Sequence, residues 1–215
     1  MADAALIESI RIRAGHAPLW RHHAARLAAS ARALGLPDPP LEAPAGLPDG
    51  ALRLTYDGRR VVRDRRPVGS SEPVRLIIAT TLHEPYPHKT TDRAAFDRAL
   101  EEARTAGADD ALMATSDGSL AEAAIWGVYW WEGGTLAAPA ESLGILPSVA
   151  RRRIVEIAGP IAERRAPPEA LRTGSPFVAN AVRGVVAVAS VDGIRVGFDA
   201  SAAARTAALA TAFWP

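Results

Sequence analysis

The amino-acid sequence predicts a two-domain α+β protein. Strand-like and helix-like segments are mixed without regular β-α-β alternation, which disfavours a doubly wound parallel sheet. The 215 residues suffice for one large domain or two small ones, and a stiff segment with two prolines divides them. We therefore expect a small α+β N-terminal domain over residues 1–84, a connector over 85–88, and a larger α+β C-terminal domain over 89–215.

In the N-terminal part, alternating or continuous apolar segments predict strands over residues 6–13, 51–56, 59–63 and 74–82. The second and third of these flank Asp57-Gly58, which is typical of a hairpin turn. Apolar residues at three- and four-residue steps predict a helix over 20–34, ended by Gly35. Residues 37–50 are rich in proline, alanine and glycine and predict a loop or a poorly formed helix.

Beyond the connector, helices are predicted over residues 91–105, over 146–157, and in the alanine-rich C-terminal segment. Strands are predicted over residues 111–115, 125–131, 135–138, 184–191 and 194–196. The last two are joined by Asp192-Gly193, a second hairpin signal.

The composition is that of a folded chain with a substantial core. Hydrophobic residues make up 48% and charged residues 23%, which excludes wholesale disorder. The formal net charge is only +1, so the charge balance does not favour nucleic acid or an anionic membrane as a partner. The chain has no cysteine, which excludes disulfides, thiolate catalysis and zinc sites that need sulfur. We expect no metal site.

Neither a secretory signal nor a membrane span is indicated. The first residues lack a basic segment followed by a long apolar run, and no stretch approaches the roughly 20 apolar residues of a spanning helix. The expectation is a cytoplasmic protein.

Lys89 is the single lysine of the chain, beside 24 arginines. A lysine is ordinarily a solvated surface residue, but only a primary amine can attack a carbonyl or act as a base, which arginine cannot do. In a cleft between domains and near Arg93, desolvation and like charge would lower the pKa of this amine in the direction that such chemistry needs.

The features that follow Lys89 have a suggestive order. Glu122 comes just after a turn and before a predicted strand. Residues 146–151 begin a helix, whose free N–H groups form an anion site. A small-residue segment, 178–181, is able to bring backbone close to a phosphate.

This order resembles the class IV aminotransferase family, the fold type IV pyridoxal phosphate enzymes. The matching motifs lie, in family order and spacing, at residues 7–11, 23–27, 88–91, 101–112, 117–122 and 146–151. The resemblance implies the two-domain fold of D-amino-acid and branched-chain aminotransferases, shortened at the N-terminus. It also implies a homodimer that acts on a small-molecule substrate, with pyridoxal 5'-phosphate between the domains.

The resemblance implies roles for individual residues. Lys89 would form the Schiff base with the cofactor and later move protons, Glu122 would pair with the pyridine nitrogen, and Arg26 would hold the phosphate. The remaining contacts would be backbone N–H groups of Val149, Ala150, Asn180 and Ala181. Ser9 occupies the position of a catalytic threonine and would act as a general acid, whereas His23 is expected to be a packed helix histidine.

Within the family the resemblance is greatest to aminodeoxychorismate lyases. Arg93 at lysine-plus-four is lyase-like, and Ala94 stands where aminotransferases usually carry tyrosine. The implied reaction eliminates pyruvate from 4-amino-4-deoxychorismate to give 4-aminobenzoate, in the folate pathway. The alternatives are an amino-acid aminotransferase, with Arg11 or Arg53 holding the substrate carboxylate, and a non-catalytic family member.

One motif departs from the family pattern. Gly127 replaces the family's asparagine, and Trp126 precedes it. The expectation is that Trp126 lies at the cofactor edge and narrows or refills the substrate pocket.

Overall fold

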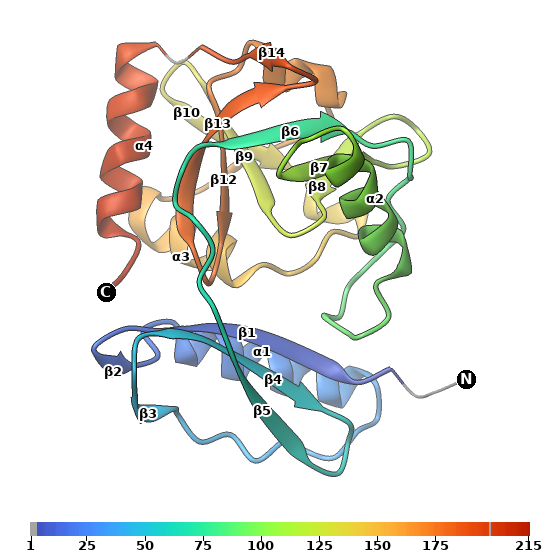
Figure 1. Ribbon diagram of the computed structural model, residues 1–215, viewed down its shortest axis with the longest axis vertical. Coiled ribbons are helices and arrows are strands. Elements are labelled where there is room, and N and C mark those ends of the chain that lie inside the picture. Colours follow the sequence, from blue (N-terminus) through green and yellow to red (C-terminus); the bar gives the residue numbers. More distant parts are fainter. Residues whose placement is uncertain (1–3, 198) are drawn as a thin grey trace.

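The computed structural model describes residues 4–197 and 199–215. It contains a three-stranded and a nine-stranded β-sheet in two separate bodies, with helices packed on each (Figure 1). The α+β fold expected from the sequence is confirmed.

The smaller body is an antiparallel sheet covered by one helix. The sheet has the order β1-β4-β5, formed by Leu6–Ile12, Gly50–Tyr56 and Val61–Arg66. Helix α1, Trp20–Ala33, packs against β1, and its Leu27 and Ala31 bury Leu6 and Tyr56. Two short strands, β2 (Gly15–His16) and β3 (Ala45–Leu47), pair at one end.

The larger body is a mixed sheet with the order β11-β10-β9-β12-β13-β6-β7-β8, and β14 pairs with β13. Its strands are β6 Val74–Ile78, β7 Asp110–Ala114, β8 Leu120–Ala123, β9 Gly127–Glu132, β10 Thr135–Pro139, β11 Ala162–Arg164, β12 Pro176–Asn180, β13 Gly184–Val191 and β14 Ile194–Arg195. Strands β8, β11 and β12 were not expected as strands from the sequence.

Helices cover this sheet in different places (Figure 1). Helix α2, Ala94–Thr105, packs on β7 through Phe96, Ala99 and Ala103. Helices α3, Val149–Ala158, and α4, Ala200–Ala212, share an apolar cluster with β9, β12 and β13. Two short 3₁₀ helices, Glu141–Leu143 and Pro168–Arg172, lie in loops.

Strand β6 requires a correction to the expected division of the chain. The sequence placed it in the N-terminal domain, before a boundary at 85–88. The structure instead pairs it with β13 and β7, both in the larger sheet. The chain therefore leaves the small sheet after Arg66 and enters the large one at Val74, so the crossing segment is 67–73.

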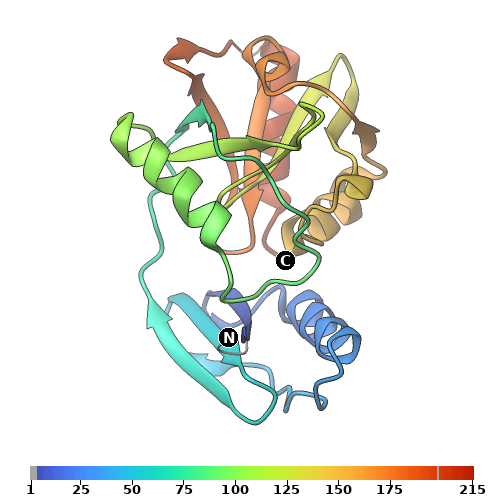
Figure 2. The ribbon, with the colours of Figure 1, turned by 90° about the vertical axis from the view of Figure 1, so that its right-hand side faces the viewer.

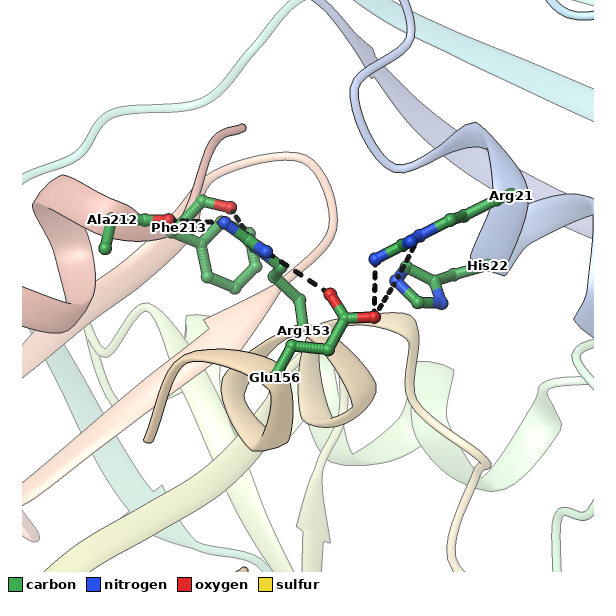
Figure 3. Close-up of polar contacts among 6 residues, drawn as sticks. All are labelled: Arg21, His22, Arg153, Glu156, Ala212 and Phe213. Atoms are coloured by element: carbon green, nitrogen blue, oxygen red, sulfur yellow. Dashed lines mark hydrogen bonds and ion pairs between the residues drawn. The ribbon is translucent and has the colours of Figure 1, made fainter. Parts of the chain in front are cut away.

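The two bodies are held together on one side by a surface cluster of charges (Figure 3). Glu156 of α3 accepts from Arg21 Nη2 of α1 at 2.6 Å, and His22 Nε2 lies 3.2 Å from the same oxygen. Arg153 pairs with the other oxygen of Glu156 and donates to the backbone carbonyls of Ala212 and Phe213. Helix α3 is thereby tied both to α1 and to the end of α4.

A second link lies within the segment 79–93, which runs back between the two bodies (Figure 2). There, Ile7 N–H donates to the Lys89 carbonyl at 2.8 Å, and Thr91 N–H donates to the Ala5 carbonyl at 2.8 Å. The backbone around Lys89 therefore pairs with β1 of the small body, although it follows β6 of the large one.

Gly144 gives a test of how tightly this segment is packed. Its φ is +76°, and an added Cβ would lie 2.9 Å from Cβ and 3.1 Å from Cα of Pro85. Because its carbonyl also accepts from Tyr86 N–H at 2.8 Å, the loop cannot simply move away. We expect Gly144→Ala to lower the free energy of unfolding by about 2 kcal/mol, measured by urea denaturation.

The matched control is Gly134→Ala in an exposed turn. There, φ is outside the left-handed region and no atom of the described residues would lie within 4 Å of the new Cβ. A loss for Gly144→Ala no larger than for this control would show that the contact with Pro85 does not constrain the loop.

Candidate active site

A cavity of about 350 Å³ lies between the two bodies, and residues of both line it. Its size is within the range of small-molecule sites. All eight predicted site residues line this one cavity: the side-chain candidates Ser9, Arg26, Lys89 and Glu122, and the backbone candidates Val149, Ala150, Asn180 and Ala181. The structure thus brings together positions that are up to 172 residues apart in the chain.

Lys89 is partly buried where the backbone pairs with β1. Tyr86 fixes the backbone of Thr90, the residue after Lys89. Its hydroxyl donates to the Thr90 carbonyl at 2.7 Å and accepts from Thr90 N–H at 2.6 Å. Burial, reinforced by the positive charges of Arg26 and Arg93, lowers the pKa of the Lys89 amine to about 7. The neutral form of the amine is therefore more populated at neutral pH than in an exposed lysine.

Glu122 lies on β8 and is 8% exposed. Its Oε1 accepts from Leu146 N–H at 3.0 Å and lies 3.0 Å from Nε2 of His83. Register places β8 against β7, opposite Met113. A carboxylate held in this way faces the same cavity as the Lys89 amine.

Arg26 is fixed by a buried carboxylate, Glu8, on β1. Its Nε and Nη2 donate to the two oxygens of Glu8 at 2.8 and 2.5 Å, and Nη1 donates to the Pro147 carbonyl at 3.1 Å. His23, fully buried as expected of a packed histidine, contacts Glu8 at 2.7 Å. Burial would raise the pKa of Glu8, but Arg26 and His23 outweigh it and lower that pKa to about 2.

The N-terminus of α3 forms one wall of the cavity. Ser148 is the N-cap, and its hydroxyl accepts from Arg151 N–H at 3.3 Å. Val149 and Ala150 supply the first N–H groups of the helix, which have no intrahelical acceptor. With the helix dipole behind them, these groups and Arg26 present N–H donors to the cavity from both bodies.

The turn after β12 also lines the cavity. The Asn180 side-chain oxygen accepts from Val182 and Arg183 N–H at 3.0 and 2.8 Å, which shapes the turn toward β13. Asn180 and Ala181 themselves line the cavity. The side chain of Asn180 therefore stabilises the turn, and only the backbone of this segment is left for the predicted contact with a phosphate.

The structure separates the two arginines considered for a substrate carboxylate. Arg53, paired with Ser9 across β4 and β1, lines the cavity. No carboxylate of residues 4–197 or 199–215 lies within ion-pair distance of it. Burial and the charges of Arg66 and Arg93 lower its pKa. Arg11 instead lines a separate hollow beside Asp49 and Arg65.

In the segment after Glu122, which departs from the family pattern, the Tyr129 side chain occupies the space beside Gly127. A Cβ at Gly127 would lie 2.9 Å from the hydroxyl oxygen of Tyr129, so glycine is what leaves room for this ring. Trp126 contributes to the lining, but it is 2% exposed and packs within the main core cluster, with the Arg183 guanidinium 4.4 Å from its ring centre.

Sequence reasoning missed His83 and Tyr86 as parts of the site. Tyr86 lies in the segment 85–88, which was interpreted as a connector because of its prolines, and His83 lies just before it. The signal available was their residue type: a histidine and a tyrosine within seven residues of the only lysine.

No group of three or more histidine, aspartate or glutamate side chains within the described ranges is arranged to hold a metal ion. Within those same ranges, no helix combines the length and apolar character needed to cross a bilayer.

The family model described as amino-transferase class IV matches residues 5–191. None of the curated proteins matches the sequence. Among solved structures, the chain is similar to a Legionella pneumophila protein named provisionally as a 4-amino-4-deoxychorismate lyase (TM-score 0.85, 20% identity, 97% of this chain and 91% of that chain).

Two further solved structures are similar to this chain. One is a branched-chain aminotransferase from Thermoproteus uzoniensis with norvaline (TM-score 0.83, 22% identity, covering 96% and 84%). The other is a Brucella abortus aminotransferase bound to the cofactor PLP (TM-score 0.75, 20% identity, covering 95% and 87%). At these identities the likeness shows a shared fold.

The Glu8–Arg26 pair generates a prediction about acid stability. Glu8→Gln should lower the free energy of unfolding at pH 7 by about 3 kcal/mol, because it leaves the buried Arg26 charge without its ionised partner. Since the folded-state pKa of Glu8 lies below its ordinary value of 4.5, its contribution is present above pH 4.5 and is lost as pH falls toward 2. The variant should therefore lose less stability on acidification than the wild type.

Urea denaturation at several pH values measures both effects. The control is Glu156→Gln in the cluster of Figure 3, where the Arg21 partner is 70% exposed; we expect a loss below about 1 kcal/mol. Equal losses for the two variants would contradict the structural role given to Glu8.

Proposed function

Because this chain belongs to the class IV aminotransferase family and its cofactor is pyridoxal 5'-phosphate, we propose that it is a 4-amino-4-deoxychorismate lyase, which releases pyruvate and forms 4-aminobenzoate. The observation that carries the proposal is that the Lys89 amine and the Ser9 hydroxyl line one cavity. They are two proton-transferring groups on adjacent backbone segments.

The residues of the cavity fit the cofactor. Lys89 supplies an amine whose lowered pKa leaves part of it neutral and nucleophilic. Arg26, with the first amides of α3, would hold the phosphate, and Glu122 would pair with the pyridine nitrogen. When bound, pyridoxal phosphate supplies an electron sink for carbanion chemistry.

The reaction needs one base and one acid from the protein. The neutral Lys89 amine would accept the proton lost from the substrate ring as the ring becomes aromatic. Ser9 would donate a proton to the departing pyruvate unit as its bond to the ring breaks. Arg53, next to Ser9 on the paired strand, would hold a substrate carboxylate.

The residues after Lys89 favour the lyase over an aminotransferase. Arg93 lines the cavity and donates to the Ala124 carbonyl at 2.8 Å, which fixes the segment after Glu122. Ala94, where aminotransferases carry tyrosine, is the first residue of α2. A homodimer, expected from the family resemblance, completes the proposal and is measurable by sedimentation.

Replacing the lysine tests the covalent chemistry. Lys89→Arg should retain the fold and net charge but abolish covalent attachment of pyridoxal phosphate, because a guanidinium does not condense with the aldehyde. Borohydride reduction of the loaded protein followed by peptide mass spectrometry should find the label on Lys89 in the wild type and nowhere in the variant.

The double variant Lys89→Arg/Arg104→Lys controls for surface labelling, because Arg104 is an exposed helix residue. A label of equal extent on the introduced lysine would show that attachment in the wild type is non-specific.

Product analysis decides between the functions. With 4-amino-4-deoxychorismate we expect pyruvate and 4-aminobenzoate in equal amounts, and Ser9→Ala should reduce the rate by about a hundred-fold if Ser9 is the acid. Keto acid from an amino-acid panel with 2-oxoglutarate, without lyase products, would support the aminotransferase. A purified protein that takes up no pyridoxal phosphate would support the non-catalytic reading.

A further inference from the structure

His83 lies on the segment between β6 and Lys89 and contacts Glu122, which lines the cavity. Its N–H donates to the Ala114 carbonyl at 2.8 Å, so the segment continues alongside the end of β7. The imidazole is fully buried and meets the Phe96 ring edge to face at 5.9 Å. The ring has therefore little freedom to turn.

The only polar contact of this ring within the described residues is with Glu122. Nε2 lies 3.0 Å from Oε1 of Glu122, while Nδ1 is buried and has no hydrogen-bond partner within residues 4–197 and 199–215. With Glu122 ionised, Nε2 must carry the proton and donate it. An apolar ring of similar size would fill the same space without leaving Nδ1 unpaired. The contact with Glu122 is what a histidine adds at this position.

The two oxygens of the Glu122 carboxylate differ in their hydrogen bonds. Oε1 accepts from both Nε2 of His83 and Leu146 N–H, each at 3.0 Å. Oε2 accepts no hydrogen bond from any residue of the described part of the chain. The carboxylate is thus held through one oxygen, and the other is available to a ligand in the cavity.

We propose that His83 is a positioning residue for Glu122, holding the carboxylate through Oε1 so that Oε2 meets the pyridine nitrogen of the cofactor. The proposal rests on the proposed role of Glu122. A neutral donor to Oε1 stabilises the ionised carboxylate, and this is the form that keeps a proton on the pyridine nitrogen. Loss of the donor should weaken cofactor binding and alter the cofactor's electronic state.

Three substitutions separate positioning from packing. His83→Leu removes the donor and keeps the site apolar. His83→Gln restores a donor, because its amide nitrogen reaches about as far as Nε2. His83→Asn carries the same amide, but at the reach of Nδ1, too short for Glu122. His16→Leu, at an exposed histidine in the small body, is the matched control.

Cofactor affinity of the apoproteins and the pH dependence of the bound cofactor's visible absorbance are the readouts. We expect His83→Leu and His83→Asn to weaken binding about ten-fold and to shift the absorbance transition. His83→Gln and His16→Leu should stay within about three-fold of the wild type. If His83→Leu does not fold, the contrast between Gln and Asn still decides.

Wild-type affinity in both Leu and Asn variants, or a Gln variant as weak as Asn, would overturn the proposal. So would ¹⁵N NMR of the apoprotein that places the His83 proton on Nδ1 alone, a readout that needs no cofactor. Failure of the wild type to bind pyridoxal phosphate would instead refute the proposed function, and the role of His83 toward the cofactor with it.

Discussion

The ion pair between Glu8 and Arg26 is the interaction on which the cavity depends. Burying both charges is costly, and the cost is met because Glu8 receives two contacts from Arg26 and one from His23. The pair fixes the guanidinium so that Nη1 reaches the Pro147 carbonyl, just before α3. One small-domain ion pair thereby places the arginine against the helix N-terminus of the other domain.

A second constraint is the excess of positive charge around the amine. Arg26, Arg53 and Arg93 all line the same cavity as Lys89, and the first and last of these lower its pKa. The same charges would attract a phosphate and carboxylates. The environment that keeps the amine partly neutral is thus also the one suited to an anionic cofactor and substrate.

The site was more predictable from the sequence than the domain division. Motif order connected Lys89, Glu122 and Arg26 because such motifs encode the local turns and caps that place a side chain. Local motifs could not predict that β6 belongs to the large sheet. It depends on pairing with β13, more than a hundred residues later, whereas the prolines at 85 and 87 report only local stiffness. His83 was missed for the same reason, since its partner Glu122 lies 39 residues away.

The backbone pairing of Lys89 with β1 has a mechanical consequence. The lysine is joined to the small domain by the Ile7 and Ala5 hydrogen bonds, while Glu122 and the start of α3 belong to the large one. Three residues before the lysine, Tyr86 N–H donates to the Gly144 carbonyl of the large domain, so the amine lies where the two domains are joined. A molecule that bonds to the lysine, Glu122 and the start of α3 would link the two domains and would stabilise their arrangement by mass action. The cofactor would then contribute to holding the two domains together, and its loss would lower the stability of the domain arrangement as well as empty the site.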